Sequence, residues 1–105
     1  MNSSSLPESD LLKQLLEPLL EDFRYWFERS QELLEREKLE FMSEVEQSTL
    51  LQKVRTAQQE VGTATSLFNL TGHQVGIDVE TMMPWHSLLM ECQAVGIRYR
   101  QTKAS

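Results

Sequence analysis

The sequence predicts an all-α fold, an antiparallel helical bundle of three main helices, and three observations support this prediction. Only four of the 105 residues are Gly and three are Pro, which are too few for the turns of an all-β sandwich. Apolar residues recur at alternating steps of four and three over two long stretches, which is the period of an amphipathic helix. Capping signals separate these stretches from each other and from the region that follows.

The first predicted helix extends from about residue 9 to residue 38. Its apolar residues form one stripe along the helix, in which Ser30 stands at a position where the period predicts an apolar residue. Further apolar residues beside the stripe widen it to the breadth of a buried face. The stripe consists of Leu12, Leu16, Leu19, Phe23, Trp26 and Leu33, widened by Leu20, Phe27 and Leu34. Pro18 interrupts it, because proline removes the hydrogen bond to Gln14. We expect either one bent helix or a short helix that meets a longer one at Pro18.

A linker over residues 38–43 leads to the second predicted helix. Ser43 and Glu46 have the spacing of a capping box, in which each side chain satisfies a free backbone amide of the other. The second apolar stripe is narrower and made of smaller residues, namely Leu50, Val54, Ala57, Val61, Ala64 and Phe68. We expect this helix to end at 71–72, with Gly72 in the left-handed conformation.

The third predicted helix follows a glycine-bearing loop over residues 72–78, begins at about residue 80 or 84, and ends near residue 101. Pro84 suits a first helical turn. Basic side chains near the end complement the negative end of the helix dipole. These cations are Arg98, Arg100 and Lys103.

The chain is expected to form one domain, because its length falls within the usual size of a single domain. We place the bundle at residues 9–102. Residues 1–8 then form a flexible N-terminal tail and residues 103–105 a C-terminal tail.

The third helix is expected to have two apolar faces. On a helical wheel one stripe consists of Trp85, Leu88, Leu89, Cys92, Val95 and Tyr99, and the roughly opposite stripe of Met83, Met90, Ala94 and Ile97, with His86 nearby. The outer face of each helix in a three-helix bundle normally meets water. The second stripe is therefore core, covered by the other helices or by the segment before Pro18, or a binding surface, or simply a small exposed stripe.

Charge and composition argue against several classes of partner. The formal net charge is −6, with twelve acids against five bases in residues 1–46, which disfavours binding to nucleic acid or to an anionic membrane surface. No apolar run approaches the roughly 18 residues of a membrane span, and no secretory signal is visible. The lone Cys92 suits a reducing compartment. We expect an acidic cytoplasmic protein with no membrane span.

The residue types that support catalysis or metal binding occur without the required spacing. His73 and His86 are the only histidines, and neither has a metal-binding partner one helical turn away on the same face. Cys92 lies about 120° from His86 on the wheel, so a Cys–His nucleophile is unsupported. The chain contains no Gly-rich phosphate loop, Cys-x-x-Cys pair or calcium loop. We expect no catalytic residue, no metal, no cofactor and no enzymatic activity.

Four sequence strings, taken in order, resemble a family of small cyanobacterial proteins catalogued as a domain of unknown function. They are LLEPLLEDFRYWF (15–27), AQQEV (57–61), QVGID (74–78) and PWH (84–86). The resemblance covers nearly the whole chain after the N-terminal tail. It implies a stand-alone cytoplasmic protein of a photosynthetic bacterium, and it implies no activity, cofactor or catalytic residue.

These observations predict a non-enzymatic interaction protein that binds a second copy of itself, as a homodimer or larger homo-oligomer, or another protein. The predicted partner-binding residues are Met83, His86, Met90, Ala94 and Ile97. The alternative is a binding module for a hydrophobic small molecule or a tetrapyrrole in the bundle core, with His86 or His73 as a polar anchor. Its pocket would be lined by Phe23, Trp26, Phe27, Phe68 and Trp85.

Overall fold

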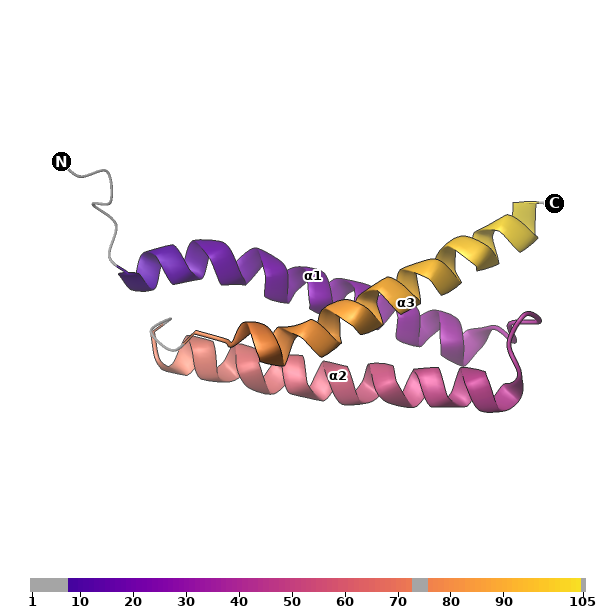
Figure 1. Ribbon diagram of the computed structural model, residues 1–105, viewed down its shortest axis with the longest axis horizontal. Helices are drawn as coiled ribbons and strands as arrows, with labels where there is room; N and C mark the ends of the chain where they lie inside the picture. Colours follow the sequence, from indigo (N-terminus) through magenta and orange to yellow (C-terminus); the bar gives the residue numbers. More distant parts are fainter. Residues whose placement is uncertain (1–7, 73–75, 105) are drawn as a thin grey trace.

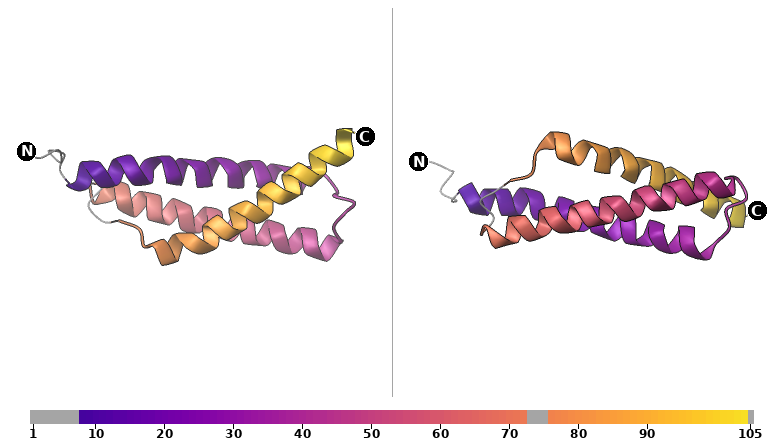
Figure 2. Two further views of the ribbon diagram at one scale, coloured as in Figure 1. Left: turned by 45° about the horizontal axis from the view of Figure 1, so that its top comes forward. Right: turned by 90° about the horizontal axis from the view of Figure 1, so that it is seen from below.

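Three α-helices make up the fold in the computed structural model, which describes residues 8–72 and 76–104 (Figure 1). They are α1 (Glu8–Arg36), α2 (Glu44–Leu70) and α3 (Val79–Ala104). Helices α1 and α2 form an antiparallel hairpin, and α3 runs in the same direction as α1 and crosses the hairpin diagonally (Figures 1 and 2). The molecule is elongated, measuring 57 × 26 × 20 Å. The predicted all-α bundle of three main helices is confirmed.

Pro18 does not divide the first helix. Helix α1 is continuous from Glu8 to Arg36, so the single-helix alternative is correct. The side chains of Pro18 and Gln14 are both exposed, and the carbonyl that loses its partner can therefore bind water. The helix ends at Arg36, two residues before the predicted end.

The buried face of α1 is rotated from the predicted stripe. The fully buried positions are Leu16, Leu20, Phe23, Phe27 and Leu34, most of which were expected only to widen the stripe. Leu19 and Trp26, expected at its centre, are 44% and 37% exposed. Because α3 crosses α1 diagonally, it leaves part of that flank open, and these two side chains lie at the edge of the core.

The linker between α1 and α2 contains a buried residue that the sequence analysis did not anticipate. Leu39 is only 1% exposed. The Gln47 side chain fixes the linker: its amide nitrogen donates to the carbonyls of Leu34 at 2.9 Å and Glu37 at 2.6 Å, and its oxygen accepts from the Leu39 amide at 3.0 Å. Buried backbone groups need hydrogen-bond partners. The Gln47 side chain supplies them here, so the chain can reverse direction between α1 and α2 while Leu39 is buried.

Both ends of α2 follow the local signals in the sequence. The Ser43 hydroxyl accepts from the Glu46 amide at 3.0 Å, and the Glu46 carboxylate accepts from the Ser43 amide at 2.8 Å, so the predicted capping box is present. At the other end Thr71 is the C-cap and Gly72 has a φ of 65°, in the left-handed region. The predicted α2 stripe is buried, with only Ala64 partly exposed.

Helix α3 is longer at both ends than predicted. The amides of Thr81 and Met82 donate to the Asp78 carbonyl, so the helix begins at Val79 and Pro84 falls in its second turn. Pro84 is the sixth residue of α3, so it removes the hydrogen bond that an amide there would donate to the Glu80 carbonyl. The helix continues beyond residue 101 to Ala104, with Lys103 in its last turn.

Candidate interaction surface

The inward face of α3 is part of the core. Trp85, Leu88 and Cys92 are buried, and the other residues of the first predicted stripe are partly buried against them. The Trp85 ring meets Phe23 edge to face at 5.6 Å, and its indole N–H donates to the Glu60 carboxylate at 2.9 Å. These contacts attach α3 to both helices of the hairpin.

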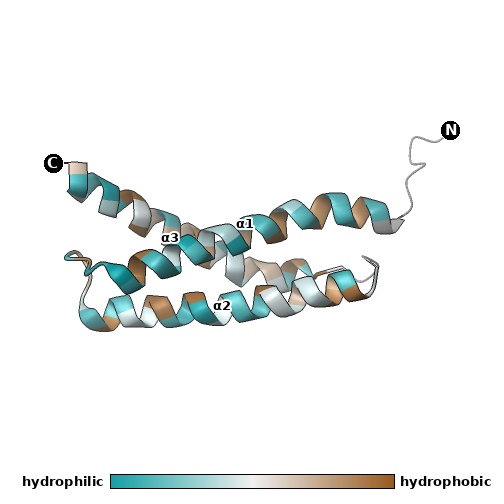
Figure 3. Ribbon diagram, turned by 180° about the vertical axis from the view of Figure 1, so that it is seen from behind, coloured by the Kyte–Doolittle hydropathy of each residue, from teal (hydrophilic) through white to brown (hydrophobic). Residues whose placement is uncertain are grey.

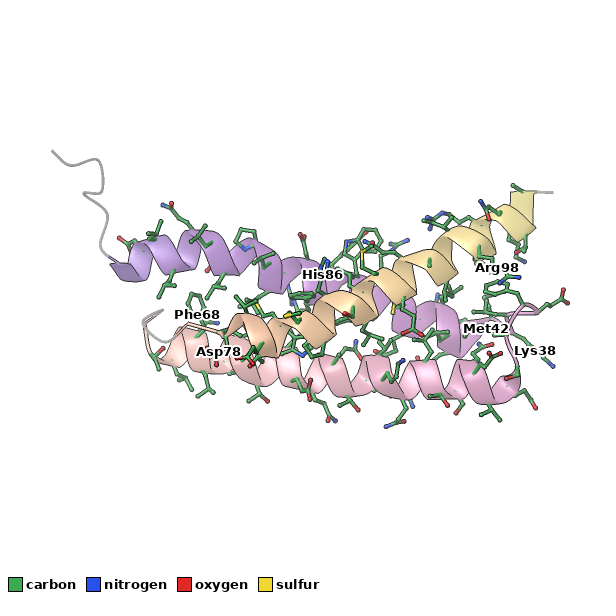
Figure 4. All side chains as sticks on the ribbon, viewed as in Figure 1. Lys38, Met42, Phe68, Asp78, His86 and Arg98 are labelled. Carbon is green, nitrogen blue, oxygen red and sulfur yellow. The ribbon has the colours of Figure 1, made fainter. Side chains whose placement is uncertain are left out.

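The two ends of α3 contact different parts of the hairpin. Near its start, Trp85 reaches Glu60 of α2. Near its end, the Arg98 guanidinium lies 4.7 Å from the centre of the Phe41 ring, a cation–π contact with the linker. Figure 4 shows Arg98 beside Met42 and Lys38 at the linker end of the bundle, and Asp78 at the opposite end. The diagonal course of α3 therefore fixes which of its faces points outward.

The second stripe of α3 lies on the outward face. Met83, Met90 and Ile97 are 60%, 55% and 49% exposed, and His86 and Ala94 are exposed as well. The structure thus brings all five predicted partner-binding residues to one solvent-facing side, and no described part of the chain covers them. Within the described residues this stripe is therefore not part of the core.

The outward face of α3 is also nearly free of charge. Between residues 81 and 97 the only charged residue is Glu91. Its carboxylate is 3.0 Å from the Lys53 ammonium of α2, which offsets the charge. An apolar, uncharged helix face that meets water is typical of a surface that another molecule covers.

Helix α1 adds to this apolar surface, which the sequence analysis missed. Trp26 and Ile97 both line a groove of about 420 Å³ between α1 and α3. Leu15 lies eleven residues, about three helical turns, before Trp26 and hence on the same side of α1. Leu15 is 59% exposed and Leu19 is 44% exposed. The sequence feature that could have revealed this contribution is the breadth of the α1 stripe, which is wider than the area that α2 and α3 cover. Figure 3 shows hydrophobic residues recurring along all three helices.

A second groove, of about 580 Å³, lies between α2 and α3 on the other flank. Its apolar lining includes Ala57, Trp85 and Leu88, and the Lys53–Glu91 ion pair borders it. Pro84 also lines this groove. The other lining residues are polar or charged, namely Thr49, Gln52, Thr56, Glu60 and Ser87. Polar and charged side chains also line the groove between α1 and α3, among them Arg29, Gln93 and Arg100.

The aromatic residues of the alternative ligand site pack against one another. Phe27 and Phe68 are 0% and 1% exposed, and the Phe23 and Phe27 rings stack at 6.0 Å. Trp26 is instead at the surface. Rings that fill the core leave less room for a ligand, so the core-ligand alternative stays a prediction that the packing does not favour.

The groups that could support chemistry are dispersed. Burial raises the pKa of the Cys92 thiol, while a hydrogen bond from Ser30 lowers it. His86 is exposed on α3, and His73 lies outside the described residues. In the described part of the chain no three His, Cys, Asp or Glu side chains are grouped so that they could hold a metal ion. Among the described residues, no helix is both long enough and apolar enough to cross a membrane.

The comparisons with known proteins place the chain in a family without assigning it an activity. No curated protein and no solved structure matches it. A family model matches residues 6–101, a range that includes α1, α2 and most of α3 and so takes in the apolar surface. The chain therefore belongs to the family described as "Protein of unknown function (DUF2605)".

Proposed function

We propose that this protein is a non-enzymatic interaction protein that binds a helix of another protein molecule along the outer face of α3. The observation that supports the proposal most directly is the stripe of Met83, Met90 and Ile97, spaced seven residues apart and about half exposed. Spaced apolar anchors on one helix face are a common means of helix recognition, and a seven-residue repeat is the period at which two helices stay in contact.

The energy available from α3 alone is modest. Full burial of an apolar side chain contributes about 1.5–3 kcal/mol, and these three side chains are already partly covered, so together they supply about 2–5 kcal/mol. Association itself costs at least about 4 kcal/mol. A stable complex therefore needs neighbouring side chains of α1, such as Trp26, which lines the groove, and Leu15, which is 59% exposed on the same side of that helix.

The test is Met90→Asp, which places a charge in the middle of the stripe. Because Met90 is exposed, we expect the circular dichroism and the free energy of unfolding to change little, by about 0.5 kcal/mol. We expect binding to be lost, as measured by light scattering of the purified protein over a dilution series and by pull-down from the native host. The matched control is Leu67→Asp, at a leucine of α2 that is 54% exposed against 55% for Met90.

Two results would contradict the proposal. If Met90→Asp unfolds the protein, the stripe is needed for the fold. If the variant associates with itself and with host proteins as the wild type does, the outer face of α3 is not a binding surface.

A further inference from the structure

The outward face of α3 presents a regular row of alternating large and small side chains. The row, here called the outer seam, consists of Met83, Ser87, Met90, Ala94, Ile97 and Gln101. Its steps alternate four and three, which keeps all six on one side of the helix, and all six are exposed. The smallest members, Ser87 and Ala94, each stand between two of the large apolar ones.

This alternation matches a second copy of the same helix running in the opposite direction. If Met90 is set beside Ala94 of the second copy, Ile97 falls beside Ser87 and Met83 beside Gln101. Every large apolar side chain then meets a smaller or flexible one. In a parallel pair each side chain would meet its own copy, so crowded Met–Met layers would alternate with voids at Ala94, and both crowding and voids are destabilising.

The charges of α3 favour the same orientation. Glu80 lies in the first turn, whereas Arg100 and Lys103 lie near the end. Within the described residues neither of these cations forms an ion pair with a carboxylate. The antiparallel register brings Glu80 alongside the last turn of the second copy's α3, and it also opposes the two helix dipoles. A parallel pair would instead place like charges side by side.

We propose that two copies of this chain associate through the outer seams of α3, antiparallel, about a two-fold axis at the level of residue 92. The contact is isologous, because each seam supplies both the large and the small side chains. Between residues 81 and 97 of α3 the only acid is Glu91, which is already paired with Lys53. This inference rests on the proposed function, since it identifies the partner of the same surface.

A size exchange between two seam positions tests the register. Ala94→Met sets Met against Met across the interface, and Met90→Ala sets Ala against Ala. We expect each single variant to raise the dimer dissociation constant at least about tenfold. The double variant Met90→Ala/Ala94→Met restores one large and one small residue per layer and should bind within about threefold of the wild type. Light scattering over a dilution series measures the mass, and circular dichroism confirms folding, since Ala and Met are both good helix formers.

The possible failures are distinguishable. A wild-type dimer whose double variant stays as weak as the single variants overturns the antiparallel register. A wild-type mass of 12.2 kDa at every concentration overturns self-association. Neither result alone removes the proposed function, which fails if Met90→Asp unfolds the protein or binds as the wild type does in both of its assays.

Discussion

Gln47 holds the turn between α1 and α2 with three hydrogen bonds from one side chain. The sequence does not reveal this role, because the backbone groups that Gln47 binds lie 8 to 13 residues earlier in the chain. They belong to Leu34, Glu37 and Leu39. The sequence analysis placed a linker at residues 38–43. Its internal order depends on a tertiary contact that no local pattern encodes.

We expect Gln47→Ala to lower the free energy of unfolding by about 1–3 kcal/mol, because it leaves part-buried backbone groups without partners. Chemical denaturation measures the change. The control is Gln59→Ala, at an exposed glutamine of the same helix, which should shift stability by no more than about 0.5 kcal/mol. Equal effects at the two positions would show that Gln47 does not hold the linker.

Glu46 makes the stability of the α2 N-terminus depend on pH. Hydrogen bonds from Ser43 hold the pKa of its carboxyl below the ordinary value of 4.5. A lowered folded-state pKa stabilises the fold above the unfolded-state pKa, and this contribution disappears as the pH falls through the folded-state value. We expect Glu46→Gln to remove this part of the acid sensitivity when unfolding is compared at pH 7 and pH 3. The control Glu44→Gln, which removes the same charge without the capping bond, should keep it.

At the level of the helices, the sequence predicts where a helix begins and ends better than it predicts which face of the helix is buried. The capping box and Gly72 are local signals, and the structure confirms both. Of the two predicted starts of the third helix, residue 80 is close to the observed start at Val79, and Pro84 lies inside the helix and not at its first turn. The buried face of α1 could not be fixed from periodicity, since Leu19 and Leu20 both fit the stripe and only the diagonal course of α3 decides between them.

Gly62 within α2 and Gly72 just after its C-cap should respond in opposite directions to the same substitution. Gly62 is exposed in the helix, and an added Cβ meets no atom within 4 Å, so Gly62→Ala should stabilise the fold by about 1 kcal/mol. Gly72 has a positive φ of 65°, and Gly72→Ala should cost about 1–2 kcal/mol. Thermal unfolding of the two variants measures both shifts. A gain at both positions would contradict the left-handed cap.

For the whole molecule, composition and helical period predicted the fold class, and the wheel of the third helix predicted a second apolar stripe without deciding whether it is core or surface. The contribution of α1 was missed because Trp26 looks like core in its own helix and is exposed only where α3 diverges from it. The angle at which two helices cross depends on packing between segments that are distant in the sequence. The pattern of apolar residues along one helix therefore does not predict that angle.

The short linker also has a consequence for the order of folding. Residues 37–43 join α1 to α2, so the contacts of the hairpin form at little cost in loop-closure entropy, whereas α3 must pack on α1 across the full length of α2. Local contacts form faster than distant ones. We therefore expect the hairpin of α1 and α2 to form before α3 packs on it, so that the outer face of α3 is held in place only after that step.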